Sequence, residues 1–215
     1  MKRYIKAAIR DILDEPLSER FNLARDPRTH TNDLRKLSND FSGDVQARVA
    51  ANPNIPADVA EKLSGSSWEL VRSSLAGNPS TPAALLDRLS HDRNFWVRVG
   101  VASNPNTPPH ILAKLANDIE SDVVLEAIKN PNLPVDTLEE LSHCTSPAIV
   151  RLVALHPNVP ISVLIAASDD FYPAIREAVI SNPKTPLDII VKLSKDKDKV
   201  VAQKAQLRLK HMGAL

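Results

Sequence analysis

Histidine, cysteine and aspartate are the residue types in this chain that are best suited to catalysis or metal binding. The sequence has six histidines and a single cysteine, which lies in the dipeptide His143-Cys144. His91 and His143 occupy the same place in two different copies of the repeat described below, ~20 Å apart by helix-layer spacing, so they cannot bind one metal ion. The recurrent aspartates belong to turns, and the five glycines are scattered rather than gathered in a phosphate-binding loop. We therefore expect no catalytic residue, no metal, no cofactor and no enzymatic activity.

Arginine forms a second pattern that could bind a ligand. Arg72, Arg98 and Arg176 occupy equivalent places in the repeat, and a continuous column of this kind could follow the phosphates of a nucleic acid. Two repeats in between have Val124 and Val150 instead, so the column is interrupted. Pairing of the arginines with the turn aspartates is the favoured interpretation. A further set of basic residues near the C-terminus is interpreted as a solvated end cap: Lys192, Lys195, Lys197, Lys199, Lys204, Arg208 and Lys210.

Aromatic residues cluster at one place in the repeat. Six of the eight fall within four consecutive places: Phe41, Trp68, Phe95, Trp96, Phe171 and Tyr172. An exposed row of rings would provide anchors for a protein partner, because Trp and Tyr dominate interface hot spots. The favoured interpretation is that most rings pack between the two helices of their own repeat, with Trp68, Trp96 and Tyr172 as the exceptions.

The second helices in the middle of the chain are more apolar than one buried stripe requires. Two interpretations remain open: a hydrophobic groove that binds a partner or a second copy of the chain, or a tighter curvature that buries these helices on two sides. The groove interpretation predicts partial exposure of Val124, Val150 and Leu152 in the monomer.

A repeat of 26 residues positions all of these side chains. An Asn-Pro dipeptide returns at Asn52, Asn78, Asn104, Asn130 and Asn182, with His156-Pro157 in the remaining place and Asp26-Pro27 as a degenerate first copy. Seven units follow: 26–51, 52–77, 78–103, 104–129, 130–155, 156–181 and 182–207, without insertion or deletion. Residues 1–25 are predicted to form a helical N-terminal cap and 208–215 a C-terminal tail, all within a single continuous domain.

Each unit contains the signals for two short helices. When the Asn is counted as position 0, a proline at position 4 predicts the first helical residue, and Thr81, Thr107 and Thr185 before it are predicted N-caps. Apolar residues at positions 7, 8 and 11 predict the first helix, and those at 19, 23 and 24 predict the second. The next Asn-Pro ends the second helix. Neither helix is long enough to be stable alone, so the units must stack.

The recurring pattern, as in ASNPNTPPHILAKLANDIESDVVLEAI, resembles the leucine-rich repeat variant family and is similar to short HEAT-like repeats. The resemblance implies an all-α, right-handed α-solenoid without β-strands, in which one helix of each repeat is partly 3₁₀. Some members of that family carry a cysteine cluster for an iron-sulfur centre before the repeats. Residues 1–25 contain no cysteine, so we do not expect that centre here.

The resulting functional prediction is a cytoplasmic, non-catalytic scaffold that binds another protein. The single cysteine indicates a reducing compartment, and no signal peptide or membrane span is apparent. A nucleic-acid-binding protein with a local basic surface is one alternative, although the net charge of +1 and the interrupted arginine column argue against it. A self-assembling structural repeat protein is another, and we expect a monomer or a weak homo-oligomer.

Overall fold

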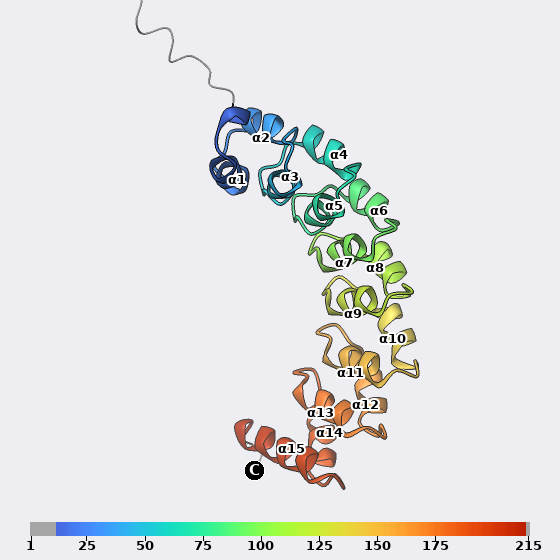
Figure 1. The fold of residues 1–215 in the computed structure, drawn as a ribbon. Coiled ribbons are helices and arrows are strands. Elements are labelled where there is room, and N and C mark those ends of the chain that lie inside the picture. Colours follow the sequence, from blue (N-terminus) through green and yellow to red (C-terminus); the bar gives the residue numbers. More distant parts are fainter. Residues whose placement is uncertain (1–11, 214–215) are drawn as a thin grey trace, which may run out of the picture. The chain divides into compact units, whose positions relative to one another are not determined.

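The computed structural model describes residues 12–213, and every regular element in this range is helical (Figure 1), which confirms the predicted all-α repeat fold. A 3₁₀ helix, η1 (Ile12–Asp14), and α1 (Leu17–Arg25) precede the repeats. The first helices of the seven repeats are α2 (Thr31–Leu37), α4 (Ala57–Ser64), α6 (Ala83–Leu89), α8 (Pro109–Leu115), α10 (Val135–Ser142), α12 (Ile161–Ala167) and α14 (Leu187–Leu193). The second helices are α3 (Gly43–Ala50), α5 (Glu69–Ala76), α7 (Phe95–Ser103), α9 (Ser121–Lys129), α11 (Pro147–Leu155), α13 (Pro173–Ser181) and α15 (Lys199–His211).

Both helices of each repeat are α-helices. Within residues 12–213, η1 is the only 3₁₀ helix, and it lies before the repeats. The 3₁₀ helix that the family resemblance implied inside the repeats is therefore replaced here by regular α-helix. At seven to nine residues, all but the last of these helices are too short to be stable alone, so packing stabilises them.

The junction between two repeats differs from the prediction in one respect. Thr81 does not cap the helix that follows it; its hydroxyl donates a hydrogen bond of 2.6 Å to the carbonyl of Leu75, near the end of the preceding helix. Thr107 and Thr185 do the same for Val101 and Val179. The proline at position 4 is then the N-cap, as Pro82 is for α6. The threonine therefore adds a second hydrogen bond to a carbonyl in the last turn of the preceding helix, which also accepts the N–H of the junction asparagine.

The Asn of each Asn-Pro dipeptide joins neighbouring repeats. Asn78 Nδ2 donates to the carbonyls of Ala50 and Asn52 at 2.7 and 2.9 Å, and its Oδ1 accepts the N–H of Ser80. Asn52, Asn104 and Asn182 make the equivalent bonds at their own junctions. The side chain, which follows one second helix, therefore links it to two carbonyl groups at the end of the second helix one repeat earlier.

The helices stack as two layers in each of two compact units, of which the first ends at Ile111 and the second begins at Leu112. In the first unit, α1, α3, α5 and α7 pack successively against one another, while α2, α4 and α6 form the other layer (Figure 1). In the second unit, α9, α11, α13 and α15 pack in the same way. The second helices therefore form the closely packed layer in both units.

Buried apolar residues lie where the periodicity predicted them. Leu34, Leu86, Leu112, Leu138 and Leu164 of the first helices are fully buried. Position 24 of the second helices is a buried alanine in four repeats, at Ala50, Ala76, Ala102 and Ala154, and a buried isoleucine in two, at Ile128 and Ile180.

The segment before the first predicted repeat contains a further half-repeat. α1 begins at Leu17, which is 26 residues before the start of α3, and it packs on α3 as α3 packs on α5. Arg20 pairs with Asp40, which lies 20 residues later. The first 11 residues of the predicted N-terminal cap lie outside the described residues. At the other end, α15 continues to His211, so the first part of the predicted C-terminal tail is helical.

Candidate functional site

Exposed aromatic rings lie in the loops between the two helices of repeats in the first unit, or in the first turn of the second helix. Phe41 is 95% exposed, and Trp68 and Trp96 are 55% and 56% exposed. Trp68 is the N-cap of α5, and its ring lies flat against the backbone of Gly43, where an added Cβ would come within 3.0 Å of Trp68 Cδ2. Phe95 is half-buried and supports Trp96, with ring centroids 4.6 Å apart. The two tryptophans are therefore held in place while half of each side chain remains accessible.

A second pair of rings occupies the equivalent loop in the second unit. Phe171 is 78% exposed and Tyr172, the N-cap of α13, is 47% exposed. Their rings meet edge to face, with centroids 5.4 Å apart. Ile119 stands in the loop before α9 and is 93% exposed. Ile119 occupies the same repeat position as Phe41 and Phe171, which is the signal by which it could have been found, but its side chain is not aromatic.

The expectation that most rings pack between the helices of their own repeat is wrong. Trp68, Trp96 and Tyr172 are exposed, as expected of the exceptions, but Phe41 and Phe171 are more exposed still. The space between the two helices is already filled by leucine and valine, for example Leu37 and Val45, so no room remains for a ring. The loops therefore present apolar surface that the core does not need.

The arginines at position 20 hold neighbouring repeats together. Arg72 directs Nε and Nη2 at the carboxylate of Asp92, at 2.6 and 3.0 Å, and Nη1 at the carbonyl of Ser66, at 2.7 Å. Arg176 makes the same three bonds to Asp196 and to the carbonyl of Asp170, at 2.6 to 2.8 Å. Both arginines are buried. The predicted pairing with turn aspartates is thus confirmed, but the aspartate belongs to the following repeat.

The arginines are consequently unavailable for phosphates. Arg98 donates to the carbonyl of Asp92 at 2.8 Å, the same contact within its own loop. The hydrogen bond from Arg176 lowers the pKa of the Asp196 carboxyl, more than burial raises it. The basic column Arg72, Arg98 and Arg176 is therefore part of the junctions between repeats.

The apolar second helices of the middle repeats are more deeply buried than expected. Val124 and Val150 are 7% and 8% exposed, so the predicted exposure is wrong for these two, whereas Leu152 is partly exposed, as predicted. Position 20 faces the adjoining repeat, which is why a valine there is covered. Leu152 and Leu155 border a hollow of about 180 Å³ together with Ile128, Lys129, His156 and Pro157.

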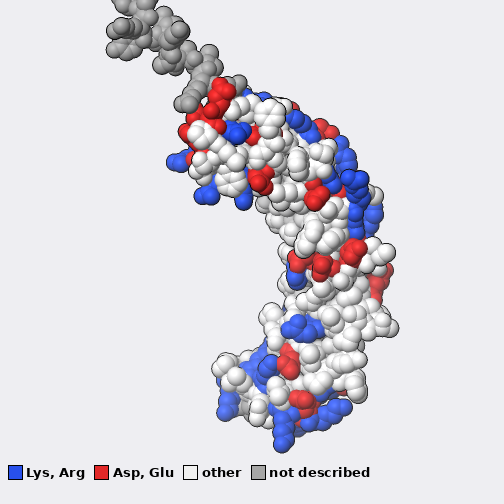
Figure 2. Space-filling view, in the orientation of Figure 1, with Lys and Arg blue, Asp and Glu red and all other residues white. Residues whose placement is uncertain are grey.

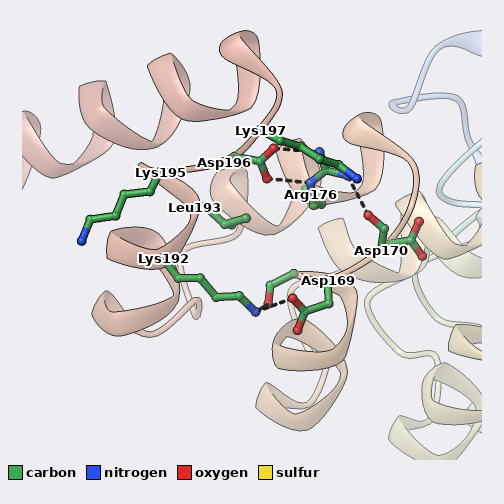
Figure 3. Close-up of a pocket in the computed structure, with 9 residues that line it drawn as sticks. Asp169, Asp170, Arg176, Lys192, Leu193, Lys195, Asp196 and Lys197 are labelled. Atoms are coloured by element: carbon green, nitrogen blue, oxygen red, sulfur yellow. Dashed lines mark hydrogen bonds and ion pairs between the residues drawn. The ribbon is translucent and has the colours of Figure 1, made fainter.

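Basic side chains gather over α14 and α15, at the C-terminal end of the second unit (Figure 2). A hollow of about 280 Å³ lies there, and acids pair with two of the four cations that line it (Figure 3). Lys192 pairs with Asp169 at 2.7 Å, and Arg176 is held by Asp196. Lys195 extends away from the hollow (Figure 3). With Lys192 and Arg176 paired and Lys195 turned away, Lys197 is the one remaining cation among the described residues that line the hollow, and a single lysine does not make the converging set that binds an anion.

Within residues 12–213, no three histidine, cysteine, aspartate or glutamate side chains lie close enough to hold a metal ion. His143 is exposed, and Cys144 is half-buried with its thiol 3.7 Å from the carbonyl of Ser146. No helix in the described range has the length and apolar character needed to cross a membrane.

Comparison with known proteins supports the repeat assignment. A family model described as leucine rich repeat variant matches residues 95–119, which contain α7, the Asn104-Pro105 junction, α8 and most of the loop that follows α8. A solved structure titled as a leucine-rich repeat variant with a novel repetitive protein structural motif is similar over 94% of this chain and 88% of that one, with 21% identity and a TM-score of 0.64. The predicted resemblance to this family is thus confirmed, and the fold is shared.

More distant helical repeats also align. A designed armadillo repeat protein in complex with the peptide (KR)4 aligns over 93% of this chain and 95% of that one, with 13% identity and a TM-score of 0.32. A TM-score this low is too small to indicate the same fold. No curated protein matches the sequence.

Proposed function

We propose that this chain is a non-catalytic scaffold that binds another protein through the exposed rings of its inter-helix loops. The observation that carries the proposal is the pair Trp68 and Trp96, which are held against the backbone and a neighbouring ring while half of each side chain meets solvent. Preorganised tryptophans lose little conformational entropy on binding and provide a large apolar contact. Phe171 and Tyr172 offer a similar surface in the second unit.

The same geometry weighs against a nucleic-acid-binding surface. Arg72 and Arg176 are buried in ion pairs. At the basic end, Lys192 and Lys204 pair with Asp169 and Glu177. Continuous free cations along a backbone are what phosphate recognition needs, and these side chains are already neutralised.

The test is affinity capture from a lysate of the native cells, treated with nuclease and read by quantitative mass spectrometry. The variant Trp68→Ala/Trp96→Ala is compared with the wild type and with Leu187→Ala, which removes an equally exposed apolar side chain from α14 in the second unit. We expect a stoichiometric protein to be lost at least about tenfold in the double variant and retained in the control. Circular dichroism checks that each variant folds.

Two other results would replace the proposal. Capture of nucleic acid without nuclease treatment, released by moderate salt and unaffected by the tryptophan substitutions, would favour the basic end as the functional surface. A mass that grows with concentration and no captured partner, measured by light scattering, would favour self-assembly.

A further inference from the structure

One junction between repeats in the second unit has kept its aspartate but lost its arginine. Position 20 of the fifth repeat is Val150, and the aspartate 20 residues later is Asp170. Where Arg72 and Arg176 are present, the corresponding carboxylates accept two bonds from a guanidinium. Among residues 12–213, the Asp170 carboxylate accepts a single hydrogen bond, from the N–H of Tyr172 at 2.8 Å. This carboxylate therefore retains most of its acceptor capacity.

The neighbouring junction shows what a fully substituted pair looks like. There the arginine is replaced by Val124, and the aspartate 20 residues later is replaced as well, by Cys144. Val124 is buried, so an apolar side chain fills the place and no charge is left over. At the junction of Val150 and Asp170, a valine stands in place of the arginine, but the aspartate is present.

A second cation is missing at the same junction. In three repeats, position 10 is a lysine or arginine that reaches the serine 24 residues earlier: Lys62 reaches Ser38, Arg88 reaches Ser64 and Lys192 reaches Ser168. In the sixth repeat this position is Ala166, so Ser142 receives no such cation. Asp170 is thus left beside a junction that lacks both of the bases that other junctions have.

The missing side chains leave an open hollow of about 130 Å³ in the second unit. Its walls are Val150, Val163, Ala166 and Ala167, and its polar atoms come from Ser142, His143 and Asp170. An adjoining hollow of about 180 Å³ shares part of this wall and adds Glu139, a further acid. Phe171 and Tyr172 follow Asp170 directly in the chain and are exposed. The site therefore combines an under-bonded carboxylate, an apolar channel and aromatic rings.

We propose that this hollow is a docking socket for an arginine side chain of a partner protein, which takes the place that Arg72 and Arg176 occupy in their own repeats. The guanidinium donates to both carboxylate oxygens of Asp170 and to the backbone carbonyl of Cys144. This carbonyl lies at the place of the two that Arg72 and Arg176 bond, which are the backbone carbonyls of Ser66 and Asp170. The methylene groups of the arginine lie along the channel, and an adjacent apolar residue of the partner contacts Tyr172. The proposal rests on the scaffold function, because the arginine comes from another polypeptide.

The experiment titrates the full-length, ¹⁵N-labelled chain with a five-residue peptide, acetylated and amidated, with arginine at its centre and leucine beside it. The amide of Tyr172 reports binding, because it donates to Asp170. We expect saturable shifts at Tyr172 and Cys144. A peptide with citrulline, which has nearly the same shape but no charge, is expected to bind at least about tenfold more weakly, since charge-assisted hydrogen bonds are lost.

Three variants locate the binding. Asp170→Asn is expected to weaken the arginine peptide at least about tenfold. Asp169→Asn is the matched control, because this adjacent aspartate pairs with Lys192 outside the socket, and it is expected to leave the affinity unchanged. Val150→Arg supplies the missing side chain from within the chain, so it is expected to abolish peptide binding and to raise the melting temperature.

The outcomes separate this proposal from the scaffold function. Equal binding of the arginine and citrulline peptides, or undiminished binding to Val150→Arg, overturns the socket while the tryptophan surface stands. The socket is also overturned if the wild-type chain binds no peptide while Val150→Arg is more stable, since the hollow then accepts an arginine only from within the chain. Saturable binding that depends on Asp170 supports the socket even if the tryptophan variant loses no partner.

Discussion

His156 is the residue at which one repeat departs from the asparagine used at the other well-formed junctions. Its Nε2 lies 3.1 Å from the carbonyl of Asn130, and its Nδ1 accepts the N–H of Asn158 at 3.0 Å. The ring therefore imitates part of the asparagine side chain with a neutral tautomer in which Nε2 carries the proton. Burial lowers the pKa of this imidazole, and the charge of Lys184 lowers it further. The hydrogen bond to the carbonyl of Asn130 raises the pKa, but by less than burial lowers it.

The lowered pKa predicts a pH-dependent stability. A group whose pKa is lower in the folded state stabilises the protein fully above its unfolded pKa of about 6.5 and loses that contribution as the pH falls toward the folded pKa. We expect His156→Asn to remove this loss between pH 7.5 and 5.5, and to add about 1 kcal/mol at pH 7.5 through a second carbonyl bond. Urea denaturation at both pH values measures it. An unchanged pH dependence in the variant would mean that other histidines are responsible.

The pair of Arg72 and Asp92 predicts strong coupling between two residues. Arg72→Val leaves a buried carboxylate without its partner and is expected to cost about 3–5 kcal/mol. The double variant Arg72→Val/Asp92→Cys copies the residues that the chain itself uses at 124 and 144, and is expected to recover at least about 1 kcal/mol. Urea denaturation of both variants, of Asp92→Cys and of the wild type gives the four free energies of unfolding of a double-mutant cycle. Additive losses would contradict the coupling.

Helix boundaries were largely predictable from the sequence because proline and asparagine act locally. The residue before a proline avoids the α region, so Asn104 and Asn182 end α7 and α13 as expected. The direction of the threonine bond was not predictable from spacing alone. A hydroxyl can donate or accept, and only the fold shows that it donates to the carbonyl of Leu75.

The threonine at the junction gives a prediction at the scale of one helix pair. Thr81→Val keeps the shape of the side chain but removes the second of the two hydrogen bonds that the carbonyl of Leu75 accepts, and leaves it with the N–H of Asn78. We expect a loss of about 1–2 kcal/mol in the free energy of unfolding, measured in urea. Thr81→Ser keeps the hydroxyl and should retain most of the stability. Equal losses in the two variants would indicate that the methyl group, rather than the hydrogen bond, matters.

The candidate site was harder to predict than the helices, for a reason that applies to all stacked repeats. Periodicity identifies equivalent residues, but it does not say which neighbouring copy each one faces. Arg72 was expected to find an aspartate and does, yet in the following repeat. Val150 was expected to be partly exposed because its helix has more apolar residues than one buried face requires. Position 20, however, faces the junction with the following repeat, so Val150 is buried. The open carboxylate of Asp170 became visible only once this geometry was known.

At the scale of the whole molecule, the chain behaves as a series of linked junctions. The asparagine at position 0 donates to the carbonyl of the position-0 residue one repeat earlier, as seen for Asn52, Asn78 and Asn104. After the last repeat Arg208 takes this role, because it donates to the carbonyls of Ile180 and Asn182. Each link joins only adjacent repeats, so stability is expected to be a sum of repeats and nearest-neighbour junctions. Removing the hydrogen bonds of one junction should then increase local opening of the helices next to that junction more than opening of the helices farther along the same unit.

Asn52→Ala tests this expectation in the first unit. The substitution removes bonds of 2.9 Å to the carbonyls of Ala24 and Asp26, which tie α1 to the second repeat. We expect amide hydrogen exchange in α1 to accelerate at least about tenfold while α5 and α7 keep their protection, because their own junctions are intact. Asn54→Ala is the control: its exposed bond to Pro27 should change exchange much less. Uniform acceleration from α1 to α7 would show instead that the unit opens as one cooperative block, and that the asparagines strengthen it without dividing it.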